Sequence, residues 1–150
     1  MKTLVLGVGN PILGDDGVGI HVIRELRKKI KDVDFDEVSV SGLELVELFR
    51  GYDKVIIVDA IKTKQGIPGE IRELTLDNIP TLHGITPHDV DFKTAFEYGK
   101  RFIDKMPDEV RIIGIEVDKI NEFDEKLSAK VSESIPKAAK LIKEDLLNGS

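Results

Sequence analysis

Continuous apolar runs alternate along this chain with segments whose apolar residues have helical spacing. Short apolar segments rich in β-branched residues predict strands, and apolar residues that recur every three to four positions predict helices. The predicted strands are Thr3–Val8, Phe35–Val40, Lys54–Asp59, Glu70–Leu74 and Val110–Val117. The predicted helices are Gly17–Lys31, Leu43–Phe49, Phe92–Lys105 and Asp124–Leu147. This alternation indicates an α/β fold with a five-stranded sheet and helices on both faces.

The predicted elements differ in how their apolar residues are distributed. Thr3–Val8 and Lys54–Asp59 are almost continuously apolar, which is typical of central strands buried on both faces. Polar and apolar residues alternate in Glu70–Leu74, which indicates a half-exposed or edge strand. Asp77–Asp91 carries prolines and a glycine and predicts a long surface loop, a kind of segment that is often functional. The apolar face of the last helix continues across Pro136, so we expect a kink there rather than an end.

Composition and charge limit the classes of function that this chain can have. The 150 residues are expected to form one domain, residues 1–150, and the content of 41% apolar and 33% charged residues is typical of soluble globular proteins. The absence of cysteine excludes disulfides, thiolate metal sites and cysteine nucleophiles. A net charge of −6 argues against general nucleic-acid binding. Neither a membrane-length apolar run nor a signal peptide is recognised, so we expect a cytoplasmic protein without membrane contact.

The stretch GNPILGDDG, residues 9–17, has the two-glycine spacing of a phosphate-binding P-loop. However, Asp15 and Asp16 stand where that loop carries its Lys and its Ser or Thr, and two carboxylates would repel phosphate. The dinucleotide pattern Gly-x-Gly-x-x-Gly fails as well, because Ile12 takes the place of its third glycine. An aspartate at a helix start is commonly an N-cap, which explains one of the pair. The other aspartate is a candidate functional residue.

Two further candidates lie elsewhere in the chain. Asp59 follows four apolar residues, and at a strand end it would face the crevice in which open α/β sheets bind ligands. The alternative is an aspartate that caps a loop. His88 follows the stiff Pro87 in the predicted long loop, where the alternative is a solvated histidine and His83 is a rival. His21 falls within the first predicted helix and is interpreted as structural or surface-exposed.

Two carboxylates and a histidine at one sheet edge would form a set of oxygen and nitrogen ligands. Such a set suits Zn, Ni, Fe or Mn with open coordination positions. The hypothesis depends on the rule that sites lie at strand ends, because no His-Glu-x-x-His motif is present. Nucleophilic catalysis has little support without a cysteine or a Gly-x-Ser-x-Gly motif. Asp15 and Asp16 do not suggest an aspartic-protease dyad, because adjacent residues do not normally present their carboxyl groups to each other.

The glycine-rich segment resembles the N-terminal signature of the nickel-iron hydrogenase maturation endopeptidases. The resemblance lies in Gly7-Val8-Gly9-Asn10-Pro11 and Gly14-Asp15-Asp16-Gly17-Val18-Gly19, and it continues in Val58-Asp59-Ala60, Pro68-Gly69-Glu70, Thr86-Pro87-His88 and Gly114-Ile115-Glu116. These segments follow the order of the family and span most of the chain. Val117 is a departure, since many relatives are expected to have Pro after the last segment.

The resemblance implies a three-layer α/β/α sandwich, similar to phosphorylases and hydrolases. Its five-stranded sheet would be mostly parallel, with Glu70–Leu74 as the one antiparallel strand. It also implies an endopeptidase that removes a short C-terminal extension from the hydrogenase large-subunit precursor after nickel has been inserted. The metal ligands and catalytic residues of the family fall on Asp16, Asp59 and His88. Asp15 could then cap the helix and orient the loop.

In this family the nickel is thought to belong to the substrate, so Asp16, Asp59 and His88 would recognise the metal that the precursor presents. Zinc or another divalent metal is expected to substitute in vitro. Two alternatives remain open: a non-catalytic metal- or protein-binding module that docks on a hydrogenase subunit, and a metal-dependent hydrolase of small molecules. A nucleotide-binding protein ranks last because the loop is acidic. We expect a monomer.

Overall fold

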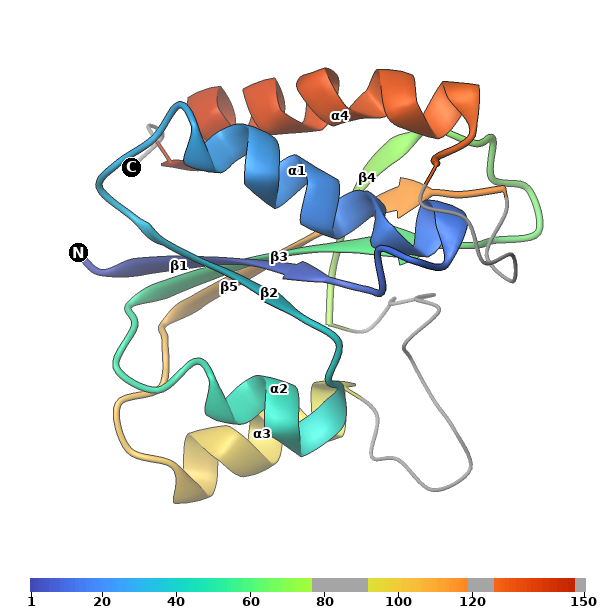
Figure 1. The fold of residues 1–150 in the computed structure, drawn as a ribbon. Coiled ribbons are helices and arrows are strands. Elements are labelled where there is room, and N and C mark those ends of the chain that lie inside the picture. Colours follow the sequence, from blue (N-terminus) through green and yellow to red (C-terminus); the bar gives the residue numbers. More distant parts are fainter. Residues whose placement is uncertain (77–91, 119–125, 148–150) are drawn as a thin grey trace.

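A mixed five-stranded sheet forms the centre of the computed structural model, which describes residues 1–76, 92–118 and 126–147. The strand order is β2-β1-β3-β5-β4 (Figure 1). The strands are β1 (Thr3–Val8), β2 (Asp34–Val38), β3 (Lys54–Ile61), β4 (Ile71–Leu74) and β5 (Glu109–Glu116). The β1–β2, β1–β3 and β3–β5 pairs are parallel, and β4 pairs with β5 in the antiparallel direction. The α/β fold and the reversed edge strand are confirmed.

Helices cover both faces of the sheet and give three layers. They are the 3₁₀ turn η1 (Gly14–Gly17), α1 (Val18–Arg27), α2 (Gly42–Glu47), α3 (Phe92–Phe102), α4 (Ala129–Leu141) and the π-helical η2 (Ile142–Leu147). In Figure 1, α1 and α4 lie above the sheet, and α2 and α3 lie below it. Each face has its own apolar cluster, because the side chains of a strand alternate between the two faces.

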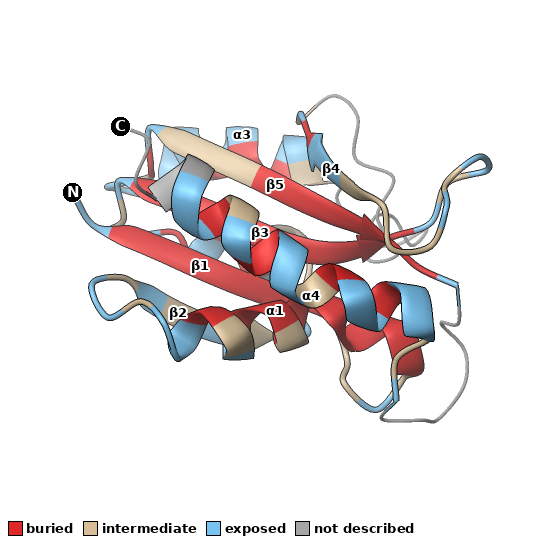
Figure 2. Cartoon of the chain, turned by 90° about the horizontal axis from the view of Figure 1, so that it is seen from above, coloured by how far each residue is buried: buried red, intermediate tan, exposed pale blue. Residues whose placement is uncertain are grey.

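The central strands are the most deeply buried part of the molecule. Every residue of β1 and β3 is buried, as their continuous apolar runs predict. The view from above shows this buried core continuing into the carboxyl half of β5, whereas β2 and β4 at the edges are mostly exposed or half-buried (Figure 2). Within the described parts of the chain, no helix is long and apolar enough to cross a membrane.

Three predicted elements have boundaries that differ from the structure. The third strand does not end at Asp59: Ala60 and Ile61 continue β3 by pairing with the last residues of β5. The first helix begins one residue later than predicted, after η1, and ends at Arg27. The last helix begins at Ala129 instead of Asp124, since Ser128 still has an extended backbone.

The remaining differences are small or lie outside the described residues. The predicted helix to Lys105 ends as α3 at Phe102, and Lys105 adopts a positive φ of 61°. The last helix continues past Pro136 to Leu141, so the prediction that Pro136 does not end it is confirmed. The predicted long loop Asp77–Asp91 lies outside the described residues, and it stays a prediction.

Candidate active site at the carboxyl edge of the sheet

The carboxyl ends of the parallel strands meet at one edge of the sheet, on the right in Figure 1. The chain leaves β1 there, turns through residues 9–13 and enters η1, which packs against β3. In parallel α/β sheets this edge is where ligands bind. The glycine-rich stretch and the carboxylate of β3 therefore lie at the same edge.

The glycines of the loop allow an unusually close approach of backbone segments. Gly9 has a φ of 149°, and a Cβ atom there would overlap the carbonyl oxygen of Asp16. A Cβ on Gly19 would overlap the carbonyl oxygen of Val58, so a side chain would push α1 away from the end of β3. The glycine spacing thus brings two carboxylate-bearing segments together, instead of forming a cradle for phosphate.

Asp16 and Asp59 are both buried at this edge of the sheet. Asp16 is 5% exposed, and its Oδ2 accepts a hydrogen bond of 2.9 Å from the backbone N–H of Asn10, two residues beyond β1. Asp59 is 4% exposed and directly follows Val58, the register partner of Gly7 in β1. Its Oδ1 accepts a hydrogen bond of 2.8 Å from the backbone N–H of Ala60.

Asp59 differs from the prediction in its surroundings. It lies inside β3 and is buried, where the sequence suggested a carboxylate that faces an open crevice after the strand. Side chains two apart share a face of the sheet, so Asp59 lies on the face of Ile57 and Ile61, toward the α2–α3 layer. A carboxylate in this position is directed by the strand and has little freedom to move, which suits a metal ligand.

The third predicted ligand, His88, lies outside the described residues, as does its rival His83. Within residues 1–76, 92–118 and 126–147, no group of three histidine, aspartate or glutamate side chains could hold a metal ion. The two carboxylates fit the donor chemistry that the sequence suggested. The complete ligand set of Asp16, Asp59 and His88 stays a prediction.

Asp15 does not cap the helix that follows it, and the N-cap interpretation is wrong for both members of the pair. Its carboxylate is fully buried and accepts hydrogen bonds from the N–H (2.7 Å) and hydroxyl (2.8 Å) of Ser128, the residue before α4. It also accepts one of 3.0 Å from the N–H of Asp118, just beyond β5. Asp15 therefore fixes two remote segments against the loop that carries Asp16.

Glu116 is a buried carboxylate whose role the sequence interpretation did not identify. It ends β5, is 1% exposed and accepts hydrogen bonds from the hydroxyl (2.6 Å) and N–H (3.2 Å) of Thr63. A Cβ on Gly66 would overlap this carboxylate. Glu116 thus fixes the loop that follows β3. The available signal was the one that marked Asp59, a carboxylate at the end of an apolar strand.

His21 lies in α1 and is half-buried, in agreement with a structural role. Burial lowers its pKa, with a further contribution from the positive charge of Arg24, so the imidazole is neutral at pH 7. Its Nε2 is buried, and among the described residues it has no hydrogen-bond partner.

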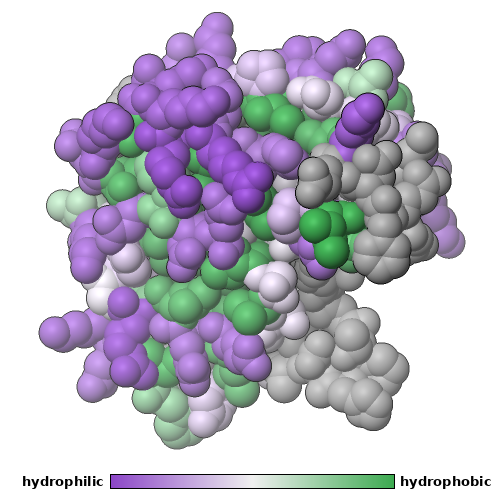
Figure 3. Space-filling view, viewed as in Figure 1, coloured by the Kyte–Doolittle hydropathy of each residue, from purple (hydrophilic) through white to green (hydrophobic). Residues whose placement is uncertain are grey.

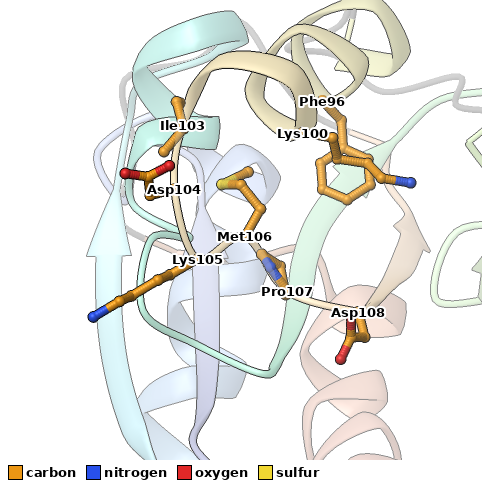
Figure 4. A pocket seen from close by; sticks show the side chains of 8 residues that line it. All are labelled: Phe96, Lys100, Ile103, Asp104, Lys105, Met106, Pro107 and Asp108. Carbon is orange, nitrogen blue, oxygen red and sulfur yellow. The ribbon is translucent and has the colours of Figure 1, made fainter.

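A further hollow lies away from this edge. It has a volume of about 440 Å³ and lies between the end of α3 and the start of β5, lined by Phe96, Lys100 and residues 103–108 (Figure 4). The start of a parallel strand is the amino edge of the sheet, opposite to Asp16 and Asp59. This hollow is therefore not part of the candidate site.

Comparison with known proteins relates this geometry to one family. The family model described as hydrogenase maturation protease (HycI) matches residues 20–145. The hydrogenase 2 maturation protease of Escherichia coli (strain K12) is 30% identical over 120 residues, which cover 77% of this chain and 73% of that protein.

Solved structures agree with the sequence relatives. The hydrogenase maturating endopeptidase HybD from E. coli has a TM-score of 0.75 and 26% identity, covering 95% of this chain and 90% of that chain. The hydrogenase 2 maturation peptidase from Thaumarchaeota archaeon SCGC_AB-539-E09 has a TM-score of 0.68 and 29% identity, covering 96% and 97% of the two chains. The resemblance noted in the sequence is thereby confirmed.

Proposed function

This chain belongs to the hydrogenase maturation protease family, and from this premise we propose that it removes the C-terminal extension of a nickel-loaded hydrogenase large-subunit precursor. The reaction is the hydrolysis of one peptide bond in a protein substrate. The observation that carries the proposal is that two buried carboxylates, Asp16 in η1 and Asp59 in β3, both lie at the carboxyl edge of a sheet with this family's fold.

Asp16, Asp59 and His88 are proposed to complete the coordination shell of the nickel ion that the precursor presents. Two carboxylates and an imidazole offer oxygen and nitrogen donors to a borderline divalent cation. The buried positions of Asp16 and Asp59 favour binding of a cation, because water screens a charge poorly there. A precursor without nickel brings no positive charge to this edge and gains little on binding.

The proposed recognition also places the scissile bond near a Lewis acid. Nickel held between precursor and protease can polarise the carbonyl group of a nearby peptide bond or lower the pKa of a water molecule. The protein contributes position: Asn10 orients Asp16, and the β3 backbone orients Asp59. Asp15 and Glu116 hold the segments around the candidate site in place by accepting hydrogen bonds from them.

The experiment that tests the proposal measures the mass of the precursor. The purified protein is mixed with large-subunit precursor from the same source, once nickel-loaded and once nickel-free, and the products are read by mass spectrometry. Loss of a C-terminal peptide from the nickel-loaded sample alone is the expected result. Equal cleavage of both samples would contradict metal recognition, and a stable complex without cleavage would favour a docking module.

Single variants test the ligand assignment in the same assay. Asp16→Asn, Asp59→Asn and His88→Ala should each abolish processing of the nickel-loaded precursor. Asp104→Asn, an exposed aspartate at the opposite edge, and His83→Ala are matched controls that should process normally. Normal processing by Asp59→Asn would remove that residue from the site, and loss of processing in His83→Ala but not in His88→Ala would reverse the histidine assignment.

A further inference from the structure

A small hollow borders the glycine-rich loop on the side facing α1. It has a volume of about 290 Å³ and is lined by Pro11, Ile12, His21 and Arg24. Ile12 is a large aliphatic residue and is 47% exposed. In the space-filling view, hydrophobic atoms reach the surface on the right, in the region where β1 runs into η1 (Figure 3).

Hydrogen bonds tie this hollow to Asp16. The backbone N–H of Asn10 donates to Asp16 Oδ2 (2.9 Å), and the side-chain Oδ1 of Asn10 accepts from the N–H of Ile12 (3.1 Å). The N–H of Leu13 donates to the carbonyl of Asn10 at 3.1 Å and closes the turn. The wall of the hollow is therefore fixed relative to the carboxylate of Asp16.

The charges around the hollow are already balanced. The guanidinium of Arg24 donates to Glu37 on β2, with Nε–Oε1 and Nη2–Oε1 distances of 3.2 and 3.0 Å. Burial keeps the pKa of His21 low, so this side chain is neutral at pH 7. Pro11 and Ile12 add apolar surface. A charged side chain would find no unmatched opposite charge among these lining residues, whereas an uncharged one would bury apolar area against Ile12.

We propose that this hollow is a specificity subsite, which receives an uncharged side chain of the precursor polypeptide next to the bond that is cut. The inference rests on the proposed function. The occupant is a side chain of the protein substrate because the loop that forms one wall of the hollow is hydrogen-bonded, through the N–H of Asn10, to Asp16 of the candidate site. Ile12 is the residue that determines specificity, and Glu37 keeps Arg24 from attracting an acidic side chain.

The test uses nickel-loaded large-subunit precursor as the probe, in which the residues flanking the cut bond are changed in turn to Leu, Asp and Lys. Ile12→Ser should lower kcat/KM for the best precursor by about tenfold, mainly through KM, since it removes one apolar contact. Glu37→Gln should improve the Asp-flanked precursor relative to the Leu-flanked one by roughly fivefold, because Arg24 is then unpaired. Phe102→Ser is the matched control: Phe102 is 64% exposed at the end of α3 and should have no effect.

A cross-linking measurement gives a readout that does not depend on turnover. Benzoylphenylalanine at position 12 should form a photoproduct with the C-terminal segment of the nickel-loaded precursor, and at position 102 it should not. Unchanged specificity in both variants and no product from position 12, while the wild-type protein still cuts, would overturn the subsite and leave the proposed function standing. If the wild-type protein leaves the nickel-loaded precursor intact, the proposed function and the subsite both fail.

Discussion

Replacement of Asp15 by alanine should destabilise the whole fold although the residue lies beside the candidate site. The carboxylate is fully buried and accepts hydrogen bonds from Ser128 and Asp118, which lie 113 and 103 residues away in the sequence. In Asp15→Ala two backbone N–H groups and one hydroxyl lose this acceptor. Unsatisfied donors of this kind cost about 1–3 kcal/mol each and are not additive, so we expect a loss of about 3–5 kcal/mol.

The loss can be measured by urea unfolding followed by circular dichroism and by thermal melting. For a domain of this length about 1 kcal/mol corresponds to about 2–4 °C, so the midpoint should fall by roughly 6–20 °C. Asp15→Asn keeps one carbonyl oxygen as acceptor and should lose less. Ser128→Ala removes only the hydroxyl donor and should cost about 1 kcal/mol.

A double-mutant cycle then isolates the interaction. If Asp15 holds the start of α4 as described, Asp15→Ala and Ser128→Ala should be less than additive in the double variant, because both remove the same contact. An Asp15→Ala protein that loses less than about 1 kcal/mol, or a cycle with additive effects, would refute the assignment of Asp15 as the link between the loop and α4.

Three further predictions concern separate parts of the molecule. Gly9→Ala should abolish precursor processing, because its Cβ would overlap the carbonyl oxygen of Asp16 and its φ of 149° disfavours a side chain; normal processing would contradict the loop geometry. The hydroxyl of Tyr52 donates a 2.6 Å hydrogen bond to Asp34, which raises the pKa of Tyr52 to about 12. This contact stabilises the fold at pH values below the unfolded pKa of about 10, and the stabilisation is lost as pH rises through 12. Absorbance titration of the Asp34→Asn variant should show the pKa of Tyr52 falling toward 10. Phe49→Ala removes a fully buried ring and should cost about 3–5 kcal/mol in urea unfolding, and a loss under 1 kcal/mol would mean that the cavity collapses.

The strands, and which of them are buried, could be predicted because both follow from local periodicity. Thr3–Val8 coincides with β1, and the alternating segment Glu70–Leu74 became the exposed antiparallel edge strand β4 (Ile71–Leu74). Apolar runs identify buried strands regardless of what they pack against. The direction of β4 followed from the family resemblance, because alternation alone does not distinguish parallel from antiparallel pairing.

The predicted ends of helices and strands are wrong where a residue distant in the sequence determines them. The last helix starts at Ala129 because Ser128, extended, donates its N–H and hydroxyl to Asp15. β3 extends past Asp59 because β5 continues beside it as far as Glu116. Neither partner is near in the sequence, so no local pattern contains this information.

The sequence by itself predicted the chemistry of the candidate site. The acidic glycine loop argued against phosphate binding on charge grounds, and its aspartate pair and the carboxylate after the third apolar strand, Asp59, became candidates. The choice of Asp16 over Asp15 came from the family resemblance. Residue type carries this information, since the donor chemistry of a side chain is a local property.

Only the tertiary structure decided what the other carboxylates do. Asp15 and Asp16 are adjacent and chemically identical, yet one accepts hydrogen bonds from the start of α4 and the other from the turn after β1. Glu116 fixes the loop after β3 in the same way. The role of a buried carboxylate depends on which donors the fold brings within about 3 Å of it, and those donors come from segments far away in the chain.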